Sequence, residues 1–187
     1  LWDGPPNPDI FSYGISKRIL FAQSKAYKLQ YDFNSYNLII DNTYGPYDNF
    51  NPNESRVIPA LITKFNDAVT KNSPFVNIWG SGKSIRQFLY VEDLVEIIKY
   101  VVENDIIYDT INISNGQTLT INELVSYISE IFKFKGEIKY DISKPEGAAK
   151  RLMDNSRMIN SINYNDFHFI KDGLLKTVKW YKSNIIN

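Results

Sequence analysis

The sequence predicts an α/β fold in which parallel strands alternate with helices. Three observations support this prediction. Several segments of ten or more residues repeat apolar side chains at helical spacing, short β-branched and aromatic runs lie between them, and turns rich in Gly, Pro and Asn separate the two kinds of segment. Strands that alternate with helices in this way favour a parallel sheet covered by helices.

The N-terminal part of the chain predicts a loop, a long helix and a strand. Residues 1–11 are rich in Pro and Gly, which is typical of a loop. Ser12 is a good N-cap for a helix over 13–31, where an apolar stripe begins with Ile15 and Ile19. A short strand is expected at 36–40, closed by Asn42 and the turn Tyr44-Gly45-Pro46. A polar loop then occupies 45–55.

The rest of the chain continues the alternation. The helices show apolar residues three or four positions apart, and the strands are short apolar runs. Thr120 with Glu123 forms a capping box, which fixes the start of one helix. In chain order we expect a helix from 57 or 59 to 69, a strand at 75–79, a turn at 80–82, a strand at 88–91, a helix at 92–103, a strand at 110–113, a helix from 120 to 132, a strand at 138–140 and a helix at 172–180.

The composition excludes several classes of function. The 187 residues carry 21 basic and 21 acidic side chains, a balance that argues against a general nucleic-acid or anionic-membrane binder. Without cysteine there is no disulfide framework and no thiol nucleophile, and one histidine makes a metal site unlikely to form from His or Cys ligands. No apolar run reaches the roughly 18 residues that span a bilayer. We therefore expect a cytoplasmic protein with no metal.

The residues that point to chemistry are Tyr13 and Lys17. At positions i and i+4 of a helix they share one face, about half a turn from the apolar stripe. An ammonium beside a phenol stabilises its phenolate form, which makes the pair a proton donor and acceptor. The spacing alone is common, and an exposed helical pair without function would look the same.

Further motifs give this pair a context. Asn42-x-Tyr44-Gly45-Pro46 follows it, and then comes Trp79-Gly80-Ser81-Gly82-x-x-x-Arg86-x-Phe88-x-Tyr90-Val91-x-Asp93. In this order and spacing the motifs resemble the extended short-chain dehydrogenase/reductases, the NAD-dependent epimerase/dehydratase family, that act on nucleotide sugars. The segments 48–61 and 144–154 are similar to the GDP-L-fucose synthase branch of that family.

The resemblance, which spans about residues 1–181, implies the C-terminal part of a Rossmann-like fold together with a small α/β substrate-binding domain. Residues 1–44 would belong to the dinucleotide-binding domain. Residues 45–187 would bind mainly the nucleotide sugar, with segments near 75–113 returning to the Rossmann-like sheet. The resemblance also implies NADP as cofactor, with NAD as the alternative, and a GDP-linked sugar as substrate.

The resemblance assigns roles to individual residues. Tyr13 would protonate the alkoxide of a reduced 4-keto sugar, and Lys17 would hold the cofactor ribose. Ile40 and Asn42 would lie beside the nicotinamide, and Asn42 would also face the substrate. The remaining candidates would bind the nucleotide: Lys64, Arg86 and Arg151 as cations for the diphosphate and Trp79 near the base.

Arg56 departs from the pattern. In the segment 53–59 the fucose-synthase branch places a His that acts as acid and base in epimerisation. An arginine keeps its proton throughout the accessible pH range, so it cannot take over that role, although it can hold an enolate or a phosphate electrostatically. We therefore interpret Arg56 as a catalytic residue of changed function and expect a reductase without epimerase activity. The one His, His168, is interpreted as structural.

A second departure is the absence of the Gly-rich turn that binds dinucleotide phosphates in this family. No Gly-x-x-Gly-x-x-Gly or Gly-x-Gly-x-x-Gly occurs, and the segment 80–84 fails as a Walker loop because Asn77 stands where its first Gly belongs. Only 12 residues precede Tyr13, so we expect the chain to be part of a longer enzyme and to show no NADPH turnover by itself.

Two alternatives stay open from sequence. One is a UDP- or dTDP-sugar 4-epimerase or dehydratase, and the other is a non-catalytic domain that binds nucleotide sugars on the same scaffold. We also expect the intact protein to be a homodimer paired through the helix at 13–31, although the Ile15 and Ile19 stripe would equally fit against the sheet.

Overall fold

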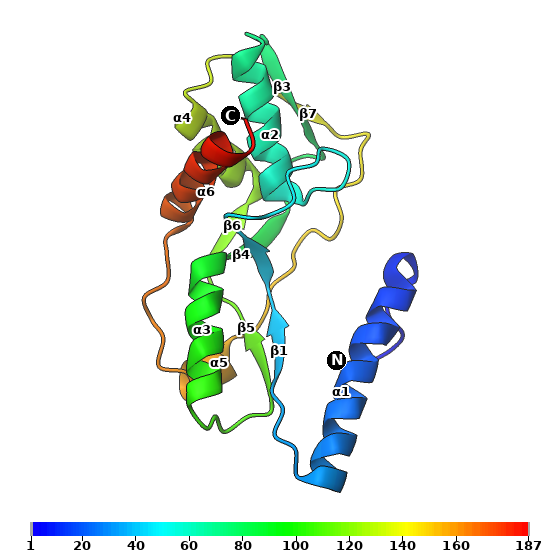
Figure 1. The fold of residues 1–187 in the computed structure, drawn as a ribbon. Coiled ribbons are helices and arrows are strands. Elements are labelled where there is room, and N and C mark those ends of the chain that lie inside the picture. Colours follow the sequence, from blue (N-terminus) through cyan, green and yellow to red (C-terminus); the bar gives the residue numbers. More distant parts are fainter. Residues whose placement is uncertain (1, 187) are drawn as a thin grey trace.

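A computed structural model describes residues 2–186 (Figure 1). Helices and strands alternate along the chain, as predicted. The helices are α1 (Phe11–Tyr31), α2 (Val57–Thr70), α3 (Val91–Glu103), α4 (Ile121–Phe132), α5 (Ser156–Ser161) and α6 (Ile170–Asn184), with a 3-10 turn at Pro8–Ile10. The strands are β1 (Asn37–Ile40), β2 (Asn42–Tyr44), β3 (Phe75–Trp79), β4 (Ile85–Tyr90), β5 (Thr110–Ile113), β6 (Thr118–Thr120) and β7 (Glu137–Asp141).

The strands pair mainly in parallel, which confirms the predicted α/β fold. Strand β1 pairs with β5, β2 with β4, and β3 with β7, all in parallel, whereas β6 runs antiparallel to β4. Strands β1 and β2 form one extended run that changes partner at Asp41, whose N–H donates to the carbonyl of Ile113 at 3.0 Å. The β1–β2 run thus changes its pairing partner from β5 to β4 at a single residue.

Two apolar clusters lie on opposite sides of β4. Phe88 and Tyr90 belong to the larger cluster, which also takes side chains from α2, β3, α4 and α6. Leu89 belongs to the second cluster, with side chains from α3 and β5. Successive side chains of a strand point to opposite faces, so β4 connects the two cores.

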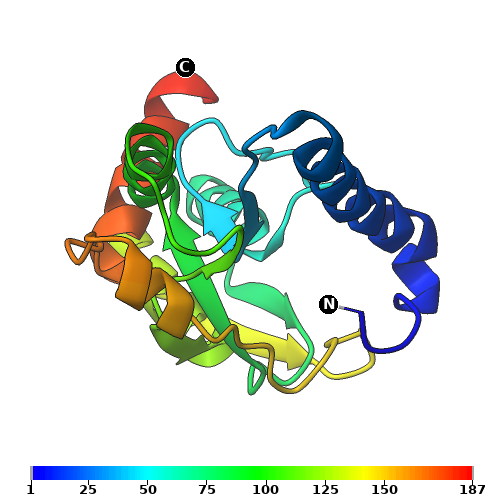
Figure 2. The same cartoon turned by 90° about the horizontal axis from the view of Figure 1, so that it is seen from below.

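Helix α1 stands apart from both cores. No residue of α1 is buried, and Ile19 is 49% exposed. Figures 1 and 2 show α1 lying to one side of the remaining elements, connected to β1 by residues 32–36. Of the two uses left open for the Ile15 and Ile19 stripe, packing against the sheet does not occur within the described residues, because the stripe covers no core there.

Several predicted boundaries were wrong. Helix α1 begins at Phe11, before Ser12, and has no side-chain cap because a preceding 3-10 turn, capped by Asn7, leads the chain directly into the helix. Strand β4 extends back to Ile85, and Val91 already belongs to α3. Strands β2 and β6 and helix α5 were not predicted, since three to six residues carry too little periodicity. The capping box of Thr120 and Glu123 is confirmed.

Candidate functional site

Two adjoining cavities lie between α2, the loop before it and strands β2–β4. The Trp79 cavity, of about 390 Å³, is lined by residues of α2, β3 and β4 and by Glu146. The Tyr13 cavity, of about 480 Å³, lies between the start of α1, residues 40–44 and Arg151. The cavities share four lining residues: Asn42, Arg56, Val57 and Phe88. A ligand in one cavity therefore reaches the border of the other.

Trp79 ends strand β3, and its side chain is open to solvent, with the residue 60% exposed. The Lys64 ammonium lies 5.2 Å from the ring centre and donates to the carbonyl of Asn77 at 3.1 Å. The Lys144 ammonium lies 5.8 Å from the same ring centre. Burial lowers the pKa of Lys64 below its ordinary value. An exposed indole flanked by two ammonium groups offers a stacking surface together with positive charge.

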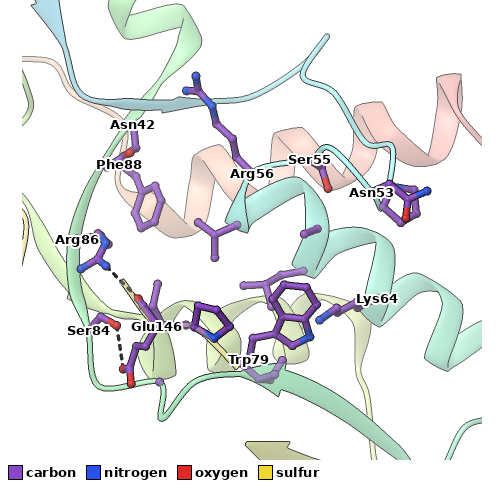
Figure 3. A pocket seen from close by; sticks show the side chains of 18 residues that line it. Asn42, Asn53, Ser55, Arg56, Lys64, Trp79, Ser84, Arg86, Phe88 and Glu146 are labelled. Carbon is purple, nitrogen blue, oxygen red and sulfur yellow. Dashed lines mark hydrogen bonds between the residues drawn. The ribbon is translucent and has the colours of Figure 1, made fainter. Parts of the chain in front are cut away.

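Glu146 lines this cavity and holds the turn between β3 and β4 by hydrogen bonds (Figure 3). Its carboxylate accepts from the Ser81 N–H at 3.2 Å, the Ser81 hydroxyl at 2.7 Å and the Ser84 hydroxyl at 2.9 Å. These hydrogen bonds lower the pKa of Glu146 to about 2. The Arg86 Nη2 donates to the carbonyl of Glu146 at 3.4 Å, and Nη1 donates to that of Ile85 at 2.8 Å. The Glu146 loop thereby holds the Arg86 side chain against the cavity.

A glycine permits this close approach. Gly80 has φ +79, a conformation that favours glycine, and a Cβ there would lie 3.0 Å from the side chain of Glu146.

The charge of the Trp79 cavity follows from the side chains that line it. Among the residues that line this cavity, Arg56, Lys64 and Arg86 are cationic, Glu146 is the one carboxylate, and that carboxylate already accepts from serine donors. The Trp79 cavity therefore suits an anion that carries an aromatic group.

The Tyr13 cavity brings together residues from distant segments. Tyr13 is exposed on the first turns of α1, and Ile40 ends β1. The Lys17 ammonium lies 5.4 Å from the centre of the Tyr13 ring but does not line either cavity. Arg151 lines the Tyr13 cavity, not the Trp79 cavity where the diphosphate was expected.

Asp41 and Asn42 lie at the junction of the cavities. Asn42 lines both, and its amide donates to the Asp41 carboxylate at 3.1 Å and to the carbonyl of Gln87 at 3.0 Å. Burial raises the pKa of Asp41, while hydrogen bonds from Asn42 and Ser114 and the charge of Arg151 oppose that shift. Arg56, at the N-cap of α2, lines both cavities, and in Figure 3 its guanidinium extends away from Trp79.

The structure therefore places the predicted residues in two adjoining groups. Tyr13, Ile40, Asn42, Arg56 and Arg151 line one cavity, and Asn42, Arg56, Lys64, Trp79 and Arg86 line the other. Sequence reasoning gave no role to three residues of these walls, Asp41, Ser55 and Glu146, nor to Lys144 beside Trp79. Only Lys144 and Glu146 carried a signal, since they lie in a segment that already resembled the family. The Ser55 hydroxyl is buried and has no hydrogen-bond partner in residues 2–186.

Comparison with known proteins identifies the family. The model described as the NAD dependent epimerase/dehydratase family matches residues 2–114. The chain belongs to this family. Within the range 2–186 no helix is long and apolar enough to cross a membrane, and no group of three or more His, Cys, Asp or Glu side chains is arranged to hold a metal ion.

Relatives within the epimerase/dehydratase family share both sequence and fold. "Probable GDP-L-fucose synthase 1" of Oryza sativa subsp. japonica is 35% identical over 187 residues, which are all of this chain and 57% of that protein. A GDP-L-fucose synthetase from Naegleria fowleri bound to NADP superposes with a TM-score of 0.90 at 26% identity, over 100% of this chain and 60% of its own.

A third relative is a reductase. A GDP-mannoheptose C4 reductase from Campylobacter jejuni with NADP bound superposes with a TM-score of 0.81 at 28% identity, over 97% of this chain and 63% of its own. The chain thus spans about three-fifths of the length of these relatives. Its α/β fold matches the corresponding part of the extended short-chain dehydrogenase structures.

Proposed function

We propose that this chain is the nucleotide-sugar-binding part of an NADP-dependent reductase that acts on a GDP-linked 4-keto sugar. The observation that supports this most is the junction of the two cavities. A nucleotide diphosphate in the Trp79 cavity would place its sugar near Asn42 and Arg56, on the border of the cavity that Tyr13 lines. The relatives named for GDP-linked sugars support the nucleotide.

The walls of the Trp79 cavity supply what a nucleotide diphosphate needs. The Trp79 ring is exposed and offers a surface on which a base can stack. Lys64 and Arg86 line the same cavity from α2 and β4, and cations answer the charge of a pyrophosphate. Lys144 adds a further ammonium beside Trp79. We assign the base to the Trp79 side and the diphosphate to Arg86 and Lys64.

Tyr13 and Lys17 would supply proton chemistry at the far end of the sugar. The Tyr13 hydroxyl would give its proton to the oxygen of the reduced keto group, and Lys17, whose ammonium lies 5.4 Å from the ring centre, would stabilise the phenolate that remains. NADP in its reduced form supplies the hydride in this chemistry.

The residues present fit the reactive end of such a cofactor and no more. The Tyr13 cavity is open enough for a flat ring beside Ile40 and Asn42, and Lys17 stands next to Tyr13, where a ribose would be held. No Gly-rich phosphate turn occurs in the 187 residues. The residues that would distinguish NADP from NAD are therefore not among those described, and NAD stays the alternative cofactor.

We further propose that the enzyme reduces without epimerising. Arg56 lines both cavities, so it lies where an acid or base of epimerisation would act, but a guanidinium does not release its proton. Its positive charge would instead stabilise the keto oxygen or a phosphate. A GDP-sugar C4 reductase among the structural relatives agrees with this assignment.

Isothermal titration of the 187-residue chain tests the proposal. We expect GDP to bind more tightly than UDP or dTDP, and Arg86→Ala to weaken GDP binding by about tenfold or more, since it removes a charge-assisted contact. Lys179→Ala is the matched control because Lys179 is exposed on α6 and lines neither cavity. Preference for UDP or dTDP would instead favour a 4-epimerase or dehydratase. No nucleotide binding would overturn the proposal.

A homodimer paired through α1 is also part of the proposal. Ile19 and Leu20 are about half exposed on a helix with no buried residue, and such apolar exposure favours association. Sedimentation equilibrium of the intact protein and of its Ile19→Glu variant tests it. We expect a dimer that the charge dissociates, and a monomeric intact protein would contradict the expectation.

A further inference from the structure

Asp41 is the residue at which the extended chain leaves β5 and joins β4. Its N–H donates to the carbonyl of Ile113, the last residue of β5, and Ser114 follows that strand directly. Asn42, the residue after Asp41, pairs with Phe88 of β4. The Asp41 side chain is buried, with the residue 8% exposed. It therefore lies between the ends of two parallel strand pairs, under the junction of the two cavities.

All the hydrogen bonds of the Asp41 carboxylate come from neighbouring donors. Oδ1 accepts from the Asn42 N–H at 2.8 Å and from the Asn42 side-chain amide at 3.1 Å, and Oδ2 accepts from the Ser114 hydroxyl at 2.8 Å. A buried carboxylate needs such donors, because an unpaired buried charge costs several kcal/mol. One of these donors is the side-chain nitrogen Nδ2 of Asn42, which Asp41 therefore holds in place.

The same Nδ2 also donates to the carbonyl of Gln87 at 3.0 Å. Both of its partners are oxygens that can only accept, so the orientation of the Asn42 amide is fixed by chemistry: a rotated amide would set Oδ1 against two oxygens. Both side-chain amide hydrogens of Asn42 are already donated, to Asp41 and to Gln87. What Asn42 offers to a ligand is therefore its Oδ1 alone.

The Asn42 Oδ1 is available to a ligand. It accepts no hydrogen bond from any group in the described part of the chain, and it is not among the polar atoms sealed from solvent. Asn42 lines both the Trp79 and the Tyr13 cavities, and Figure 3 shows it beside Phe88, across from Arg86. This oxygen is an acceptor at the point where the sugar would cross from one cavity to the other.

We propose that Asp41 is a positioning residue that makes Asn42 an acceptor-only contact and thereby selects a ligand with a hydroxyl at the junction of the cavities. The proposal rests on the proposed function and adds a specificity element to it. A site built to accept from a hydroxyl discriminates against a ligand that lacks the donor, since Oδ1 is then desolvated without a partner. We assign the hydroxyl to the sugar, because Asn42 lines both cavities and so lies where a nucleotide sugar would pass from one to the other.

Titration with two ligands separates the sugar from the nucleotide. GDP probes the Trp79 cavity alone, and GDP-mannose adds a hexose with its hydroxyls. We expect the chain to bind GDP-mannose roughly 5- to 10-fold more tightly than GDP. Asp41→Ala frees one Asn42 amide hydrogen and leaves the Gln87 carbonyl as its single partner, so it should reduce that difference and leave GDP affinity unchanged. No preference for GDP-mannose in the parent chain, or a preference that survives Asp41→Ala undiminished, would overturn the proposal.

Two conservative variants show that hydrogen-bond geometry, not packing or charge, is responsible. Asp41→Asn keeps a carbonyl oxygen that can accept from both Asn42 donors, so we expect it to retain the preference for GDP-mannose. Ser114→Ala removes the third donor to Asp41 without touching Asn42, and it should also retain the preference. A reduction of the preference in Asp41→Asn as large as in Asp41→Ala would contradict the proposal.

A measurement without ligand keeps the inference separate from the proposed function. In the ¹⁵N-labelled chain the two side-chain amide protons of Asn42 should exchange slowly with water, and Asp41→Asn should preserve this protection. Fast exchange of both protons in the parent chain would overturn the inference even where nucleotide binds. Slow exchange without any nucleotide binding would support the amide orientation while the proposed function fails.

Discussion

The ammonium of Lys64 lies 5.2 Å from the centre of the Trp79 ring and donates to the carbonyl of Asn77 at 3.1 Å. Lys64 comes from α2 and Trp79 from the end of β3, so the contact joins two elements that pack against each other in the larger core. The pair therefore places a cation beside an exposed ring that lines the Trp79 cavity.

Trp79→Ala should weaken GDP binding by about tenfold or more, because stacking of a base on an aromatic ring contributes roughly 1–3 kcal/mol. Trp79→Phe keeps a stacking surface and should lose much less. Titration calorimetry measures both. Since the ring is largely exposed, neither substitution should change the free energy of unfolding by more than about 1 kcal/mol. Equal affinity in the parent chain and Trp79→Ala would exclude stacking on this ring.

The hydrogen bonds of Glu146 make a prediction about pH. The serine donors lower its pKa from the ordinary value of 4.5 to about 2. A depressed pKa means that the loop attachment is complete above pH 4.5 and is lost only as the pH falls through about 2. The carboxyl ¹³C resonance of Glu146 should therefore titrate near pH 2. A midpoint near 4.5 would show that Ser81 and Ser84 do not hold the carboxylate.

Asp93 makes a prediction about stability. Its carboxylate is fully buried and accepts from the Tyr164 hydroxyl at 2.8 Å, from the His168 N–H at 3.1 Å and from His168 Nδ1 at 2.6 Å. Asp93→Ala removes the acceptor of both His168 donors and leaves the Tyr164 hydroxyl with the carbonyl of Asp166, so it should lower the free energy of unfolding by about 3 kcal/mol or more. Urea unfolding of this variant and of the exposed control Asp105→Asn checks it. A loss below about 1 kcal/mol in Asp93→Ala would contradict the interpretation of His168 as a structural residue.

Arg56 makes a prediction about the reaction. An enzyme that only reduces a GDP-linked 4-keto sugar does not exchange hydrogens at C3 and C5, because no base removes them. Turnover in ²H₂O by the active full-length enzyme should therefore give product without deuterium at these carbons, as mass spectrometry would show. Deuterium at C3 or C5 would mean that another residue performs the acid–base step.

The sequence predicted those elements whose residues carry a strong local pattern. Helices with long apolar periodicity and the capping box at Thr120 were found to within a few residues, and the Tyr13-x-x-x-Lys17 motif led to the family together with the motifs that follow it. Strands β2 and β6 were missed because three residues carry no detectable alternation. The exposure of α1 was also missed, since periodicity tells which residues share a face and not what covers that face.

The site shows the same division. Residues inside a motif, such as Asn42 and Arg86, were found from the motif. Asp41 was not found because its importance comes from Ser114, 73 positions away in the sequence, and the contact exists only after two strands pair. Glu146 likewise depends on Ser81, 65 positions away. Hydrogen bonds across such separations leave no signal in a single sequence.

In the proposed binding mode, the Trp79 cavity binds a nucleotide diphosphate whose sugar reaches Asn42. Chemical-shift mapping of the ¹⁵N-labelled chain with GDP-mannose tests it most directly, and Trp180 of α6 provides an internal control because it lines neither cavity. We predict shifts of the Trp79 indole N–H, the Arg86 guanidinium and the Asn42 side-chain amide, with the Trp180 indole unchanged. Absence of shifts at Trp79 and Asn42, or shifts confined to Trp180, would contradict this binding mode.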